Sequence, residues 1–191
     1  LAEEAPISRP PAGPAARAGA GRRLEFVGLK GHSAPPARIA TGLAELDRVL
    51  GGGFVPGSAV LVGGDPGIGK STILLQAAAR VAAAGRRALY VSGEEAVEQV
   101  RLRALRLGLA DSPLGLACAT ALRDIAASLE QERDAALVVM DSIQTVWLDS
   151  LDSAPGTVSQ VRACAAELIR LAKSRGFALV LVGHVTKEGT L

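Results

Sequence analysis

The chain has little of three things: cysteine, aromatic side chains and net charge. Its two cysteines, Cys118 and Cys164, are far apart and form no CxxC pair, so neither a disulfide framework nor a zinc site is expected within these 191 residues. Unpaired cysteines fit a reduced, cytoplasmic setting. No apolar run is long enough to span a membrane and no signal peptide is visible, so no membrane partner is expected.

Aromatic residues make up 3% of a chain that is 49% hydrophobic, so aliphatic side chains and alanine must fill the core. The formal net charge is +2, from 21 basic and 19 acidic residues. This balance does not indicate a strongly basic nucleic-acid-binding protein, so any contact with nucleic acid has to be local. The length suggests one domain with an appendage.

Residues 1–36 are rich in Pro, Ala, Gly and Arg, as in the run SRPPAGPAARAGAGRR. Such a segment cannot bury enough apolar surface to offset its ordering entropy, so we predict a disordered linker. Its arginines could touch a phosphate backbone, although solubility and reach explain the same composition more simply. The chain starts at Leu1 rather than Met and ends at Leu191, soon after a strand-like run, so we expect a fragment.

Residues 37–191 alternate apolar strand-like runs with helical patterns, which predicts an α/β domain with a parallel sheet covered by helices on both faces. The expected strands are 58–63, 87–92, 114–119, 136–141 and 177–183. The expected helices are 71–84, 95–107, 122–133 and one that starts near 158 and stops at Gly176.

The stretch GDPGIGKS fits the phosphate-binding pattern GxxxxGK[ST], and it follows a strand and opens a helix. Glycines let backbone N–H groups turn toward phosphates, and the free amides of the helix start favour an anion. A ligand-free glycine-rich turn is the plainer alternative. We predict that ATP binds at Gly64, Asp65, Pro66, Gly67, Ile68, Gly69, Lys70, Ser71 and Thr72, with Mg²⁺ on the Ser71 hydroxyl.

Polar residues end three of the expected strands. Asp141 follows ALVVM, where a carboxylate points into the ligand crevice and suits Mg²⁺, or else caps a helix. Glu94 and Glu95 follow LYVSG, and one of them could orient water while the other serves the helix start. His184 ends the fifth strand, where it could sense a γ-phosphate or be structural.

Other side chains carry weaker signals. Trp147 is the only tryptophan, and it could stack on a base, although burial against the domain is the more common outcome. Arg162 and Lys187 could contact phosphates, but most such residues are merely solvated.

Several longer segments closely resemble the bacterial RadA (Sms) DNA repair ATPases, which are RecA-like ATPases. The match covers residues 38–191, in order. It is carried by RIATGLAELDRVLGGGFVPGSAVLVGGDPGIGKSTILLQ (38–76), YVSGEE (90–95), VVMDSIQT (138–145), VSQVRACAAELIRLAK (158–173) and GHVTKEG (183–189).

The resemblance implies a RecA-like core with strand order 3-2-4-5-1, truncated at its C-terminal end. His184 would then lie between the phosphate-loop strand and the Asp141 strand, where it could touch the γ-phosphate. The resemblance also selects Glu94 as the water-activating residue and leaves Glu95 as a first-turn acid of the helix. The catalytic residues expected are therefore Glu94, Lys70 and His184.

The resemblance further implies a DNA-stimulated ATPase that binds single-stranded DNA and promotes branch migration of recombination intermediates as a homohexamer. DNA would pass close to Trp147, Arg162, Thr186 and Lys187. A zinc motif is expected upstream of Leu1 in the full-length family, and a KNRFG motif and a protease-like domain beyond Leu191. Without the later strands, the phosphate-loop strand would form an edge of the sheet.

Two other classes of function stay open. A KaiC-like ATPase and autokinase shares the TG…LD…LGGG and phosphate-loop pattern, although the GHVTKEG segment argues against it. A nucleotide-gated assembly module without turnover would need no water-activating residue, and the presence of Glu94 and Asp141 argues against that reading.

Overall fold

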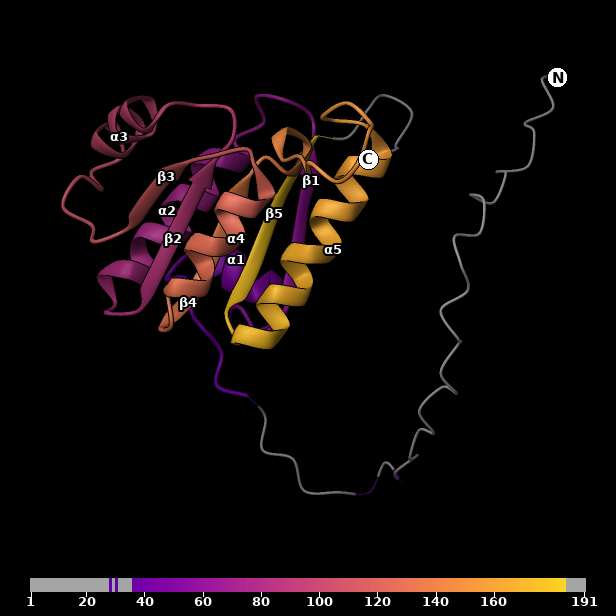
Figure 1. Cartoon of the computed structure of the whole chain (residues 1–191). Helices are drawn as coiled ribbons and strands as arrows, with labels where there is room; N and C mark the ends of the chain where they lie inside the picture. The colour runs from indigo at the N-terminus through magenta and orange to yellow at the C-terminus, as the bar shows by residue number, and fades with distance from the viewer. Residues whose placement is uncertain (1–27, 29, 31–35, 185–191) are drawn as a thin grey trace, which may run out of the picture. The chain divides into compact units, whose positions relative to one another are not determined.

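The computed structural model describes residues 28, 30 and 36–184. The chain divides into residues 1–34, of which only Gly28 and Lys30 are described, and residues 35–191, which hold the α/β domain (Figure 1). The helices are α1 (Ala44–Val49), α2 (Lys70–Ala83), α3 (Val97–Arg106), α4 (Leu122–Gln131) and α5 (Val158–Arg175), with a 3₁₀ turn, η1 (Ile143–Thr145). The strands are β1 (Ala59–Gly64), β2 (Arg87–Ser92), β3 (Gly115–Cys118), β4 (Ala135–Asp141) and β5 (Ala178–His184).

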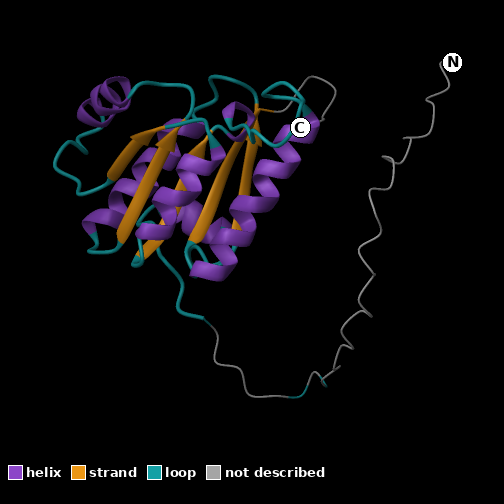
Figure 2. Cartoon of the chain, viewed as in Figure 1, coloured by secondary structure: helices purple, strands orange, loops and turns teal. Residues whose placement is uncertain are grey.

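The five strands form one parallel sheet in the order β1-β5-β4-β2-β3 (Figure 2). This is the expected RecA-like order 3-2-4-5-1, read from the other edge, so the predicted fold class is confirmed. β5 lies between β1 and β4, and β1 forms an edge of the sheet in the described part of the chain. The side chains of β1 alternate between exposed and half-buried, as an edge strand requires.

Helices cover both faces of the sheet, α4 and α5 in front and α2 behind in the view of Figure 1. Each face has its own apolar core. Leu122, Ile125 and Leu168 are among the buried residues of the α4 and α5 side, and Leu74 and Leu75 among those of the α2 side. The near-continuous apolar strands β4 and β5 supply side chains to both cores, which explains their burial along almost their whole length.

Two short elements were not expected from the sequence. The six residues of α1 include none that is buried, so no apolar stripe marks this helix. The Asp47 carboxylate holds the turn that precedes it, accepting hydrogen bonds from the Thr41 amide and hydroxyl, both at 2.8 Å, and from the Gly42 amide at 3.0 Å. The second element, η1, follows β4 directly.

Among the described residues, no helix is both long and apolar enough to cross a membrane. Those residues also include no group of three or more His, Cys, Asp or Glu placed to hold a metal ion.

Candidate nucleotide-binding and catalytic site

The predicted phosphate loop connects β1 to α2. Gly67 and Gly69 have φ angles of 81° and 97°, a conformation that favours glycine because other residues are strained there. Gly69 is the N-cap of α2, and no side chain caps the helix. The first amides of α2 are therefore left for a ligand, as binding of an anion at a helix start requires.

Lys70, the first residue of α2, is only 6% exposed. Its Nζ atom donates hydrogen bonds to the carbonyl oxygens of Gly64, at 2.7 Å, and Asp65, at 2.8 Å. The ammonium group is thus held over its own loop, where phosphate oxygens could replace these carbonyls. Ser71 and Thr72 follow on the first turn and are both half-buried.

The carboxyl ends of the strands bring the other predicted residues to the same edge of the sheet. His184 of β5 is in register with Gly64 of β1, where the phosphate loop begins. Asp141 of β4 is in register with Ser92 of β2, and Glu94 lies two residues beyond Ser92. The parallel order of the strands therefore gathers residues that are far apart in the sequence.

Glu94 contacts the ends of two other strands. Its Oε1 atom accepts a hydrogen bond from the Ser142 hydroxyl, and it lies 2.9 Å from Nε2 of His184. Since a carboxylate only accepts, Nε2 carries a proton in this contact. Burial alone would raise the pKa of Glu94, but the hydrogen bonds from Ser142 and His184 and the charge of Lys70 hold it below its usual value. The side chain is therefore a carboxylate at neutral pH.

Asp141 is 7% exposed and accepts a hydrogen bond from the Tyr90 hydroxyl through Oδ2. Burial, followed by the negative charge of Asp141, raises the pKa of Tyr90 well above its ordinary range, so the phenol stays protonated and donates. Within residues 36–184, no hydrogen bond reaches Oδ1 of Asp141. One carboxylate oxygen thus remains available as a ligand.

Glu95 is not a first-turn acid of a helix, as the resemblance implied. α3 begins at Val97, and the acid in its first turn is Glu98. The Glu95 amide donates instead to Ser92 Oγ at 2.9 Å, which extends the turn after β2, and its carboxylate pairs with Arg103. Turn chemistry at the strand end delays the helix by two residues relative to the predicted start.

Ser142, Tyr90 and Gln144 contact the predicted site residues but were not singled out in the sequence. Gln144 Nε2 donates to the His184 carbonyl at 3.2 Å. Two signals could have found two of them: a buried tyrosine needs a hydrogen-bond partner, and Ser142 directly follows the strand-ending Asp141. Their partners depend on contacts between strands and could not be read from spacing.

The candidate DNA-binding residues are only partly described. Trp147 is half-buried, and its backbone bonds to Thr120 and Leu122 at the start of α4. Arg162 on α5 is exposed. Thr186 and Lys187 lie outside the described residues. The structure therefore does not bring these four residues together.

The loop between Trp147 and α5 is fixed by one side chain. Gln160, 1% exposed, accepts from the Leu148 amide at 2.9 Å and donates to the Ser153 carbonyl at 2.8 Å. This network gives the loop a defined path beside α5.

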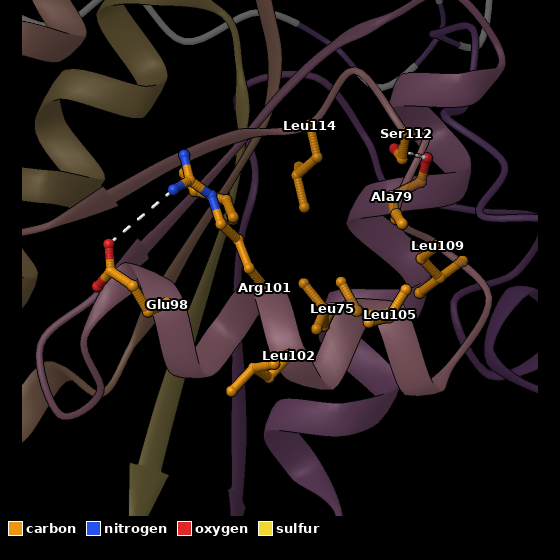
Figure 3. Close-up of a pocket in the computed structure, with 12 residues that line it drawn as sticks. Leu75, Ala79, Glu98, Arg101, Leu102, Leu105, Leu109, Ser112 and Leu114 are labelled. Atoms are coloured by element: carbon orange, nitrogen blue, oxygen red, sulfur yellow. Dashed lines mark hydrogen bonds and ion pairs between the residues drawn. The ribbon is translucent and has the colours of Figure 1, made fainter.

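A separate hollow of about 640 Å³ lies between α2, α3 and the loop before β3 (Figure 3). Its lining is mainly apolar, with Leu75 and Ala79 from α2 facing Leu105 from α3. Its charged members, Glu98 and Arg101, pair with one another at 3.9 Å. The hollow thus offers apolar contact rather than a second set of catalytic groups.

A parallel sheet in this order, with a phosphate loop after its edge strand β1, defines a RecA-like P-loop ATPase domain. The chain belongs to the AAA domain family, whose model matches residues 29–190. The resemblance to the RadA proteins is confirmed by curated relatives. The chain is 53% identical over 197 residues to the DNA repair protein RadA of Brucella abortus, covering 100% of this chain and 42% of that protein.

A similar match is found with the DNA repair protein RadA of Bacillus subtilis, at 52% identity over 154 residues, covering 81% of this chain and 33% of that protein. The chain thus spans well under half the length of these relatives. A solved structure of another ATPase domain superposes with a TM-score of 0.67 over 80% of this chain and 65% of its own. At 13% identity this likeness shows the fold alone.

Proposed function

We propose that this chain is the ATP-hydrolysing domain of a bacterial DNA repair protein. In this proposal, single-stranded DNA stimulates the ATPase, which drives branch migration of recombination intermediates. One observation carries the proposal of hydrolysis: Glu94 contacts His184, and His184 is in register with Gly64 at the start of the phosphate loop. The names of the RadA relatives support the role in DNA repair.

ATP would bind with its phosphates in the loop from Gly64 to Thr72. The amides of this loop and of the first turn of α2 would donate to the phosphates, and Lys70 would exchange its two loop carbonyls for phosphate oxygens. The Ser71 hydroxyl and the free Oδ1 of Asp141 are oxygen donors of the kind that Mg²⁺ prefers. Bound there, Mg²⁺ would neutralise part of the phosphate charge.

Glu94 would orient the attacking water. It is a carboxylate at neutral pH, and Oε1 is occupied by Ser142 and His184. Within the described residues no hydrogen bond reaches Oε2, so this oxygen can accept from a water molecule. His184, at the end of the strand next to the phosphate loop, would contact the γ-phosphate.

DNA contacts and assembly are the finer part of the proposal. Trp147 and Arg162, together with Thr186 and Lys187, would line the DNA path of a homohexamer acting in the cytoplasm. Residues 1–36 would be a flexible linker ahead of the ATPase domain of residues 37–191. The exposure of Arg162 supports contact with a phosphate backbone, and the half-buried Trp147 leaves part of its ring for stacking.

The test is release of phosphate from ATP by the chain, in the presence of Mg²⁺, with and without single-stranded DNA. The proposal predicts hydrolysis that DNA accelerates. Nucleotide binding without hydrolysis would favour an assembly module instead. Phosphate found by mass spectrometry on a serine or threonine of the chain would favour an autokinase.

A further inference from the structure

We propose that Ser142 is the positioning residue for Glu94: it holds one carboxylate oxygen so that the other faces the site of water attack. This inference rests on the proposed ATPase function and deepens it, since Ser142 acts on ATP only through Glu94.

Ser142 can hold another group because its own position is fixed. It is 0% exposed and lies between Asp141, the last residue of β4, and the turn η1. Its carbonyl accepts from the Thr145 hydroxyl at 2.8 Å. A buried serine with its backbone held in this way has few rotamers, so its hydroxyl keeps one direction.

The segment that carries Glu94 is tied to the same turn by two further contacts. The Gly93 amide donates to the Asp141 carbonyl at 2.7 Å. Gly93 also packs so closely on Thr145 that a Cβ atom there would lie 1.9 Å from Oγ1 of Thr145. The backbones on either side of the Ser142–Glu94 hydrogen bond are therefore fixed relative to one another before the side chains meet.

The hydroxyl of Ser142 has one proton to donate, and Oε1 of Glu94 receives it. His184 approaches the same oxygen through Nε2. The two donors come from the ends of β4 and β5, so they fix the carboxylate plane from two directions. A side chain that is 41% exposed would otherwise sample several rotamers, and only some of them would direct Oε2 to one place.

His184 alone would not fix Glu94 as well, because the imidazole is itself loosely anchored. Its Nδ1 atom is buried without a hydrogen-bond partner among the described residues, and its side chain is 33% exposed. Ser142 is the fully buried member of the pair, which makes it the stable reference for the carboxylate.

The test compares the unchanged chain with Ser142→Ala, and uses Ser128→Ala as the control. Ser128 lies on α4, and its hydroxyl donates to the Asp124 carbonyl of the same helix. We expect Ser142→Ala to lower kcat for ATP about tenfold to a hundredfold, as loss of a hydrogen bond to a charged group does. The Kd for ATP should stay within about twofold, because phosphate binding does not use Ser142. Ser128→Ala should change neither value.

Crystal structures of the unchanged chain and of Ser142→Ala provide a readout that does not need turnover. We expect the Glu94 carboxylate to leave its position beside His184 in the variant. A Glu94 that stays in place, an unchanged kcat, or a kcat that falls in proportion to the affinity for ATP would each overturn the role of Ser142. Absence of hydrolysis by the unchanged chain would instead overturn the proposed function.

Discussion

Oε1 of Glu94 lies 2.9 Å from Nε2 of His184, although 90 positions separate the two residues in the sequence. The contact exists because β2 and β5 are both parallel neighbours of β4, so their carboxyl ends open on the same edge of the sheet. It joins an acid that follows one strand to the last residue of a strand beside the phosphate loop. This relationship is the structural basis for assigning water activation to Glu94.

Replacing Glu94 by glutamine should separate binding from hydrolysis. Glu94→Gln keeps the shape of the side chain but removes the negative charge that accepts a proton from water. We expect kcat to fall by roughly 100-fold or more, while ATP still binds. Phosphate release and nucleotide affinity, measured side by side, check this. The matched variant Glu130→Gln, an exposed change on α4, should behave as the unchanged chain does.

Gly93 should tolerate no side chain. The Cβ atom of Gly93→Ala would meet Oγ1 of Thr145 at 1.9 Å and its Cβ at 3.0 Å, so the turn after β4 would have to move. Overpacking of this kind costs about 1–3 kcal/mol of the free energy of unfolding. Denaturant unfolding measures the loss. A second change, Thr145→Ala, should recover part of that loss, and a double variant as unstable as Gly93→Ala would contradict the steric explanation.

Asp47 should make the stability of the domain depend on pH. Partial burial would raise its pKa, but hydrogen bonds from Thr41 and Gly42 outweigh this and lower the pKa below its usual value. Because the folded-state pKa is depressed, the ionised group stabilises the fold above the unfolded pKa of about 3.9. This stabilisation is lost as the pH falls through the lower, folded-state value.

The free energy of unfolding should therefore fall more steeply in the unchanged chain than in Asp47→Asn as the pH is lowered from about 5 to 2. Urea unfolding at a series of pH values measures both slopes. Asp152→Asn, at an exposed position, should keep the slope of the unchanged chain. Identical slopes for Asp47→Asn and the unchanged chain would show that the Asp47 network does not contribute.

Much of the fold could be predicted because the apolar strands of a doubly covered sheet are visible as continuous runs. The predicted strand 58–63 differs by one residue from β1, and the run 87–92 agrees with β2. Strand order came from the family resemblance, since no local pattern encodes which strands are neighbours. The helix α1 was missed because its turn is held by one aspartate rather than by an apolar stripe.

The candidate site was predictable where a residue's role depends on its place in a strand or loop. Lys70, Asp141 and His184 follow from the motif and from strand ends. The partners of these residues did not follow, because the contact of Tyr90 with Asp141 joins residues 51 positions apart through strand register. The position of Glu95 was wrong for a different reason: hydrogen bonding within a turn decided where the helix began.

The measurement that tests the central claim most directly is Mg²⁺-dependent phosphate release from ATP by the unchanged chain and by Lys70→Ala. The variant loses the buried ammonium group that the loop holds at its centre. We predict hydrolysis by the unchanged chain and a loss of about 100-fold or more in Lys70→Ala, with Lys173→Ala, on the last turn of α5, unaffected. Equal rates in the unchanged chain and Lys70→Ala would contradict the assignment of this loop as the site of ATP hydrolysis.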